Sequence, residues 1–125
     1  MKLVVLLCLV AVVAASCGNP ADKRYSAPKT RACLASEGVK LGGLLDFVAT
    51  TSTGGAFKAH LGPNFVTLVF GQTLADAGNI NEAYHRFRAK NVGIDDVLRQ
   101  QQNAVMLWHE HPSGADLSKI TGCLK

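Results

Sequence analysis

The clearest change of hydrophobic pattern in the middle of the chain is the apolar run at residues 65–70, in which Thr67 is the one polar residue. Gly62-Pro63 precedes this run and Gly71 follows it. Glycine and proline commonly mark the ends of helices and strands. A proline is well placed in the first turn of a helix, because its missing N–H needs no partner there. The pattern therefore predicts one short apolar helix or a strand, since a run of this length fits both.

A second predicted element begins near Asn79. Asn79 and Glu82 have the spacing of a capping box, in which the asparagine accepts from a free N–H of the first turn and the glutamate reaches back. A helix is therefore predicted over residues 80–90. Its apolar face holds Ile80, Ala83, Tyr84 and Phe87. His85 points away from that face, as a surface histidine does.

The most regular amphipathic pattern follows Asp95, which can cap a helix. This helix is predicted over residues 96–109. It ends before His111-Pro112, because the residue before a proline avoids the helical region. Its predicted apolar face holds Val97, Leu98, Gln101, Ala104, Val105 and Trp108.

The remaining segments complete the prediction of an all-α fold. Ser113 can cap a last short helix that ends at Gly122. Residues 32–48 supply apolar positions interrupted by a glycine pair, so two short helices or one kinked helix are predicted there. Residues 49–56 are rich in threonine, serine and glycine and are predicted to form a loop. Helices therefore dominate, and a small all-α domain is the favoured fold class.

The N-terminus has the layout of a secretory signal peptide. Lys2 precedes an apolar run over residues 3–13, and small residues follow it up to Ser16. The run is shorter than the roughly 20 residues that cross a bilayer, so no membrane attachment is expected after its removal. Cleavage of the bacterial lipoprotein type at Cys17 is an alternative, although Ala14 stands where such signals carry leucine. We expect a secreted, extracellular protein.

The predicted organisation is a signal peptide at residues 1–16, an irregular polar arm at 17–31 and a single helical domain at 32–125. The formal net charge is +4 at pH 7 with neutral histidines, a mild basic bias. Basic residues stand in short clusters with acids interspersed, so no nucleic-acid partner is expected. No catalytic set of nucleophile and base stands out, which favours a protein that is not an enzyme.

The cysteines predict one disulfide. Cys8 leaves with the signal peptide, and three of the four cysteines remain in a chain bound for an oxidising compartment. The preferred pairing joins Cys33 to Cys123, which ties the start of the folded region to its last turn. Cys17 is then either free or bridged to a second chain, which would give a dimer. The alternative pairing joins Cys17 to Cys33 and leaves Cys123 unpaired.

Four short sequences between residues 58 and 96 carry a resemblance to a known family. They are FVTLVFGQT from Phe65, a loop containing Gly78, EAYH ending at His85, and GID from Gly93. This pattern resembles the truncated haemoglobins, the two-over-two globins of the first group. In that family an E helix ends in Phe-Gly-Gly-Thr, a loop with a glycine follows, and a short F helix carries the histidine that binds haem iron.

The resemblance implies haem as a cofactor and a diatomic gas, oxygen or nitric oxide, as a ligand. His85 falls on the proximal iron ligand, and His60 lies near the distal side. Phe65 falls on an aromatic residue that faces the haem, and Phe70 falls on the end of the same helix. Val48 stands where the family has a tyrosine that donates to bound oxygen. The implied fold is therefore a truncated-globin-like domain shortened on its distal, N-terminal side.

Two functions of different classes follow. The first is a secreted, truncated-globin-like haem protein that binds a diatomic gas or performs haem redox chemistry. The second is a cofactor-free, disulfide-stabilised helical protein that binds a small apolar ligand or acts in defence. His109-Glu110-His111 offers two imidazoles and a carboxylate, but it lacks the further protein ligand of a zinc site and is interpreted as a solvated helix end.

Overall fold

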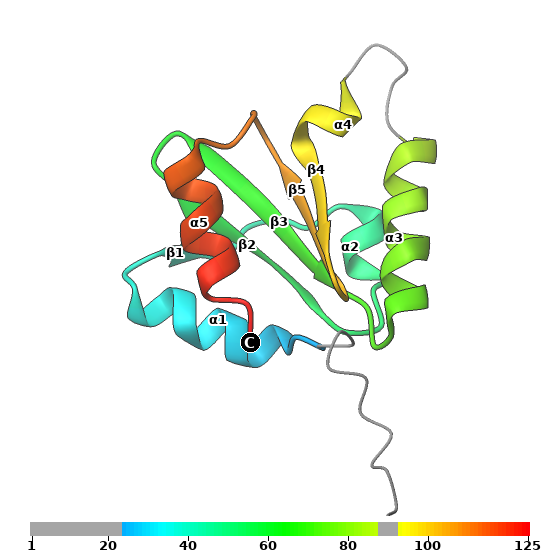
Figure 1. The fold of residues 1–125 in the computed structure, drawn as a ribbon, viewed down its shortest axis with the longest axis horizontal. Helices are drawn as coiled ribbons and strands as arrows, with labels where there is room; N and C mark the ends of the chain where they lie inside the picture. Colours follow the sequence, from blue (N-terminus) through cyan, green and yellow to red (C-terminus); the bar gives the residue numbers. More distant parts are fainter. Residues whose placement is uncertain (1–23, 88–92) are drawn as a thin grey trace, which may run out of the picture.

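A five-stranded antiparallel sheet lies at the centre of the computed structural model, which describes residues 24–87 and 93–125 (Figure 1). The sheet order is β1-β2-β3-β5-β4, and each neighbouring pair is antiparallel. The strands are β1 (Lys40–Leu41), β2 (Ala56–Leu61), β3 (Asn64–Phe70), β4 (Leu98–Gln101) and β5 (Ala104–Trp108). The prediction of an all-α, globin-like domain is therefore wrong, because the protein has a mixed α and β fold.

Helices cover both faces of this sheet (Figure 1). They are α1 (Ala27–Ser36), α2 (Phe47–Thr50), α3 (Leu74–Phe87), α4 (Ile94–Val97) and α5 (Gly114–Gly122). α1 and α5 pack on one face and enclose the larger core, whereas α2 and α3 pack on the other. α1 begins inside the segment predicted as an irregular arm, with Ser26 as its N-cap. The predicted signal peptide lies outside the described residues.

The central strands β3 and β5 carry apolar side chains toward both helical layers. Met106 lies in the core under α1 and α5, and its neighbour Val105 lies in the core under α2 and α3. A strand that is buried on both faces loses the alternation of apolar and polar residues, so its pattern also fits a helix. For this reason the helix predicted over residues 96–109 is wrong. The strand alternative for residues 65–70 is confirmed.

Two-residue turns connect the strands of both hairpins. Gly62-Pro63 joins β2 to β3, and Gly62 has a φ of 61°. A positive φ at the first turn position suits glycine, and the fixed φ of proline suits the second. Gly62-Pro63 therefore closes a hairpin and does not begin a helix. In the hairpin of β4 and β5, Gln102 takes the equivalent position with a φ of 52°.

The strained turn at Gln102 gives a stability prediction. We expect Gln102→Gly to stabilise the protein by about 0.5 kcal/mol, because relief of a left-handed conformation outweighs the flexibility that glycine adds to the unfolded chain. Thermal unfolding followed by circular dichroism would show a melting temperature raised by roughly 2–4 °C. Gln100→Gly, on the exposed part of the neighbouring strand, is the control and should lower it. A lower melting temperature in both variants would contradict the prediction.

α3 starts earlier than its predicted cap at Asn79. Thr73 Oγ1 accepts from Asp76 N at 3.0 Å, and Thr73 O accepts from Ala77 N at 3.2 Å, so Thr73 takes the capping role. Just before it, a Cβ atom on Gly71 would lie 2.6 Å from Ala77 N, which only glycine avoids. The start of α3 is therefore set by the turn that leaves β3, and Asn79 lies within the helix.

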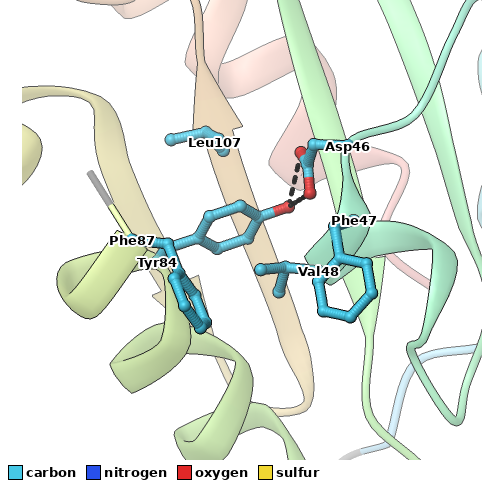
Figure 2. Close-up of a pocket in the computed structure, with 6 residues that line it drawn as sticks. All are labelled: Asp46, Phe47, Val48, Tyr84, Phe87 and Leu107. Carbon is cyan, nitrogen blue, oxygen red and sulfur yellow. Dashed lines mark hydrogen bonds between the residues drawn. The ribbon is translucent and has the colours of Figure 1, made fainter. Parts of the chain in front are cut away.

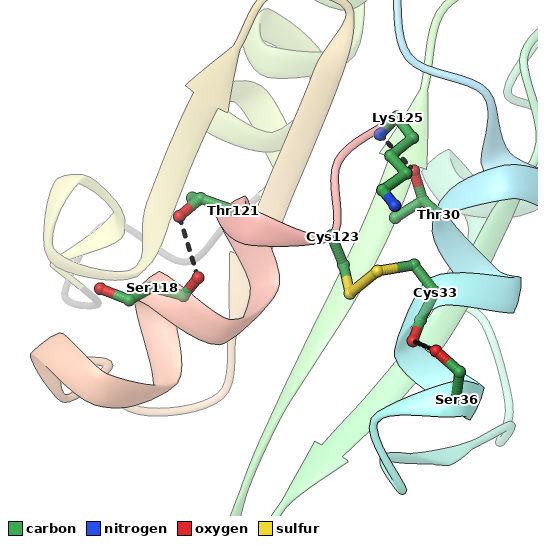
Figure 3. The surroundings of a disulfide bond; sticks show 7 residues. All are labelled: Thr30, Cys33, Ser36, Ser118, Thr121, Cys123 and Lys125. Atoms are coloured by element: carbon green, nitrogen blue, oxygen red, sulfur yellow. Dashed lines mark hydrogen bonds between the residues drawn. A yellow bond between two sulfur atoms is a disulfide. The ribbon is translucent and has the colours of Figure 1, made fainter.

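The predicted disulfide between Cys33 and Cys123 is confirmed (Figure 3). It joins α1 to the C-terminal end of α5 across 90 residues of sequence. In the chain-entropy model a loop of this length stabilises the folded state by roughly 4–5 kcal/mol. Lys125 N also donates to Thr30 Oγ1 at 3.2 Å, so the C-terminus is tied to α1 by two kinds of contact.

The end of the chain agrees with its predicted helix. Ser113 caps α5 and accepts from Asp116 N at 3.1 Å, and the helix ends at Gly122 as predicted. Among the residues that the structure describes, no helix has both the length and the apolar character needed to cross a bilayer.

Candidate functional site

A pocket of about 360 Å³ lies between α2 and α3, over β5 (Figure 2). It is lined by Asp46, Phe47, Val48, Tyr84, Phe87 and Leu107. Five of these six residues are apolar or aromatic, and the remaining one is a carboxylate. An apolar cavity with few polar groups is the usual form of a small-molecule site.

The polar wall of the pocket is a contact between Asp46 and Tyr84. Tyr84 OH lies 3.0 Å from Asp46 Oδ1 and 2.9 Å from Oδ2, so the phenol donates to the carboxylate (Figure 2). Asp46 is also the N-cap of α2, where Oδ1 accepts from Ala49 N at 2.9 Å. One carboxylate therefore holds the start of α2 and links it to α3, two elements 38 residues apart.

Two phenylalanines at the rim of the pocket are unusually exposed. Phe47 is 75% exposed and Phe87 is 72% exposed, whereas Tyr84 between them is 4% exposed. Large aromatic residues bury most of their area in folded proteins, because each removes a large apolar surface from water. Exposed rings beside an apolar pocket therefore indicate a surface that a ligand or partner covers.

The floor of the pocket is the part of the sheet that α2 leaves uncovered. Leu107 on β5 is half-buried. It has two register partners, Thr67 on β3 and Leu98 on β4. α2 has only four residues, so it covers little of this face. Leu107 thus remains accessible between α2 and α3.

The residue predicted as the proximal iron ligand, His85, lies on the exposed side of α3. Its Nδ1 is 2.9 Å from the carbonyl oxygen of Asn81, and its Nε2 is 3.0 Å from Asp95 Oδ1. The hydrogen bond with the Asn81 carbonyl and then that with Asp95 raise the pKa of His85 above its ordinary value. Both ring nitrogens are therefore engaged within the protein.

The other predicted haem residues lie on two faces of the sheet. His60 and Phe65 are register partners on β2 and β3, and their rings are 5.9 Å apart. Phe70 faces the opposite core, where its ring stacks 6.1 Å from that of Phe57. The structure thus brings His60 and Phe65 together but places neither Phe70 nor His85 with them. These residues do not fit a haem held by His85.

Phe65 belongs to a second surface feature, a stack of basic and aromatic side chains. His109 lies 4.5 Å from the Phe65 ring in a stacked arrangement, and Lys58 Nζ lies 4.8 Å from its centre. His60 Nε2 is 2.7 Å from the carbonyl oxygen of Gly42. Phe65 therefore already has partners on its ring, which accounts for its half-buried state.

The segment His109-Glu110-His111, interpreted from the sequence as a solvated helix end, instead follows strand β5, and its two histidines have different partners. His109 stacks on Phe65, whereas His111 Nδ1 lies 2.7 Å from Asp96 Oδ1 at the surface. Within residues 24–87 and 93–125, no group of three or more histidine, cysteine, aspartate or glutamate side chains is placed to hold a metal ion.

Sequence reasoning missed the main pocket residues, above all Asp46. The available signal was an aspartate directly before Phe47-Val48, which is a good N-cap for a short helix. The predicted apolar face of this helix includes both Tyr84 and Phe87, and the structure buries Tyr84 but leaves Phe87 exposed. Nothing in the local pattern indicated that Asp46 and Tyr84 would meet, because their contact depends on the sheet between them.

Comparison of the chain with protein-family models, with curated protein sequences and with solved structures finds no match. Function is therefore inferred from the geometry of the described residues, above all from the apolar pocket with a carboxylate in its wall and exposed rings at its rim.

Proposed function

We propose that this protein binds a small, largely apolar molecule in the pocket between α2 and α3. The observation that supports this most strongly is the pair of exposed rings, Phe47 and Phe87, on either side of an apolar cavity. Covering these rings with a ligand would remove apolar surface from water, which is the main source of affinity in such sites.

The volume limits the size of the ligand. About 360 Å³ is near the lower end of the range of small-molecule pockets, roughly 300–1,000 Å³. A molecule with one ring or a short chain fits better than a large cofactor. Disulfides such as that between Cys33 and Cys123 persist in oxidising compartments, which supports the further proposal that the protein is secreted.

Calorimetric titration with the neutral probe 4-phenyl-1-butanol tests the proposal. We expect wild-type protein to bind the probe, and the double variant Phe47→Ala with Phe87→Ala to bind it about tenfold more weakly, because two apolar contacts are lost. Both residues are exposed, so the fold should not change. The matched control is Leu44→Ala, since Leu44 is 91% exposed and does not line the pocket.

Two results would contradict this function. One is the absence of any heat of binding with wild-type protein up to the solubility limit of the probe. The other is equal weakening in the Leu44→Ala control and in the double variant, which would show that the probe associates with exposed apolar residues in general.

A further inference from the structure

The structure assigns a charge to the ligand of this pocket: we propose that the ligand is an organic cation, an ammonium group on a small apolar body, with Asp46 as its anchor. This inference rests on the proposed function. Among the described residues that line the pocket, Asp46 alone is charged, and its carboxylate forms the polar wall together with the Tyr84 hydroxyl (Figure 2). A ligand bound between α2 and α3 therefore meets an anion in the wall of the pocket.

The carboxylate of Asp46 has acceptor sites to spare. An ionised carboxylate offers about four lone-pair sites. Two donors use it here, the N–H of Ala49 and the hydroxyl of Tyr84, which lies about equally far from both oxygens. The remaining sites can accept from an ammonium group. The same two donors fix the orientation of the carboxylate before any ligand arrives.

In the part of the chain that the structure describes, cations of α3 and β2 have partners other than Asp46. Within the described residues, no lysine, arginine or histidine lies within salt-bridge distance of Asp46. On α3, Arg86 pairs with Glu82 at 3.2 Å, and His85 pairs with Asp95. On β2, Lys58 lies over the Phe65 ring. The negative charge in the pocket wall is therefore not neutralised by these groups.

The exposed rings suit the same ligand class. The face of a phenylalanine ring attracts a cation within about 6 Å of its centre. Phe47 directly follows Asp46 in the chain, and Phe87 lines the same pocket from α3. A ligand held at the carboxylate would thus share the pocket with both rings, and its apolar body would lie over Val48 and Leu107.

A series of ligands with one body and three head groups tests the charge. The probes are 4-phenylbutylammonium, neutral 4-phenyl-1-butanol and anionic 4-phenylbutyrate, titrated calorimetrically into wild-type protein and Asp46→Asn. Wild-type protein should bind the ammonium about five- to tenfold more tightly than the alcohol, a modest preference because Asp46 is exposed. Asp46→Asn should remove this preference, and asparagine keeps the N-cap and an acceptor for Tyr84. Asp76→Asn, which removes a charge outside this pocket, is the control and should keep it.

The outcomes separate this inference from the proposed function. Equal affinity for the alcohol and the ammonium, or tighter binding of the butyrate, would overturn the cationic ligand and leave the apolar pocket standing. Failure of all three probes to bind would overturn the pocket itself. A preference for the ammonium that persists in Asp46→Asn would also overturn the assignment of Asp46 as the anchor.

Discussion

Val105→Asp is expected to unfold the protein. Val105 is fully buried on β5, in the core that α2 and α3 build over the sheet. The substitution removes a buried valine, worth about 1.5–3 kcal/mol, and adds a desolvated carboxylate at a cost of several kcal/mol. The sum approaches or exceeds the roughly 5–15 kcal/mol that holds a typical domain folded. Circular dichroism and thermal unfolding should show little native structure at 25 °C.

The residue directly opposite Val105 provides the control for this result. Gln100 on β4 is its register partner and is exposed. Gln100→Asp places the same side chain one strand away but in water, so a change of at most about 1 kcal/mol is expected. Equal loss of stability in the two variants would show that β5 does not present Val105 to the core.

The disulfide and the last helix could be predicted because their signals are local or few in number. Without Cys8 of the predicted signal peptide, the remaining cysteines allow few pairings, and the pairing of Cys33 with Cys123 joins the two ends of the folded region. Ser113 and Gly122 mark the two ends of α5 through side-chain and backbone preferences that act within a few residues. These features do not depend on which elements pack against each other.

The sheet could not be predicted in the same way. Residues 104–108 are apolar at every position because helices cover both faces of β5, and such a run carries no period of two. The turn at Gln102 also lacks a sequence signal. A turn position with a positive φ is usually glycine, and here it is glutamine, so the sequence does not indicate a hairpin. The all-α prediction followed from reading this hairpin as one amphipathic helix.

The pocket could not be predicted from the sequence for a different reason. Its residues come from α2, α3 and β5, and the contact between Asp46 and Tyr84 spans 38 residues. Their spacing in sequence has no periodic meaning. The exposure of Phe47 and Phe87 likewise depends on which elements pack against α2 and α3, so the local sequence does not indicate it.

Asn103→Asp is expected to cost about 3–5 kcal/mol, since it leaves one buried and one half-buried carbonyl without their donor and places a carboxylate beside them. The Asn103 side chain is buried in the turn between β4 and β5, and its Oδ1 accepts from Tyr25 N at 2.6 Å. Its Nδ2 donates to Tyr25 O at 2.9 Å and to Gly71 O at 2.8 Å. This amide thus ties the segment before α1 and the turn after β3 to one hairpin. Urea unfolding at pH 7 would measure the loss.

The pH dependence of this loss identifies its cause. Burial beside two carbonyl oxygens should raise the pKa of the new carboxyl group in the folded state above its unfolded value. Stability relative to wild type should therefore be lost as the pH rises through that folded pKa and be partly restored below about pH 4, where the protonated group can donate one hydrogen bond. Gln101→Glu is the matched change from amide to carboxylate, and it removes one half-buried bond to Tyr25 OH, so a cost of at most about 1 kcal/mol is expected. Similar losses in both variants, or a loss in Asn103→Asp that does not vary with pH, would show that the amide donors of Asn103 do not hold these segments together.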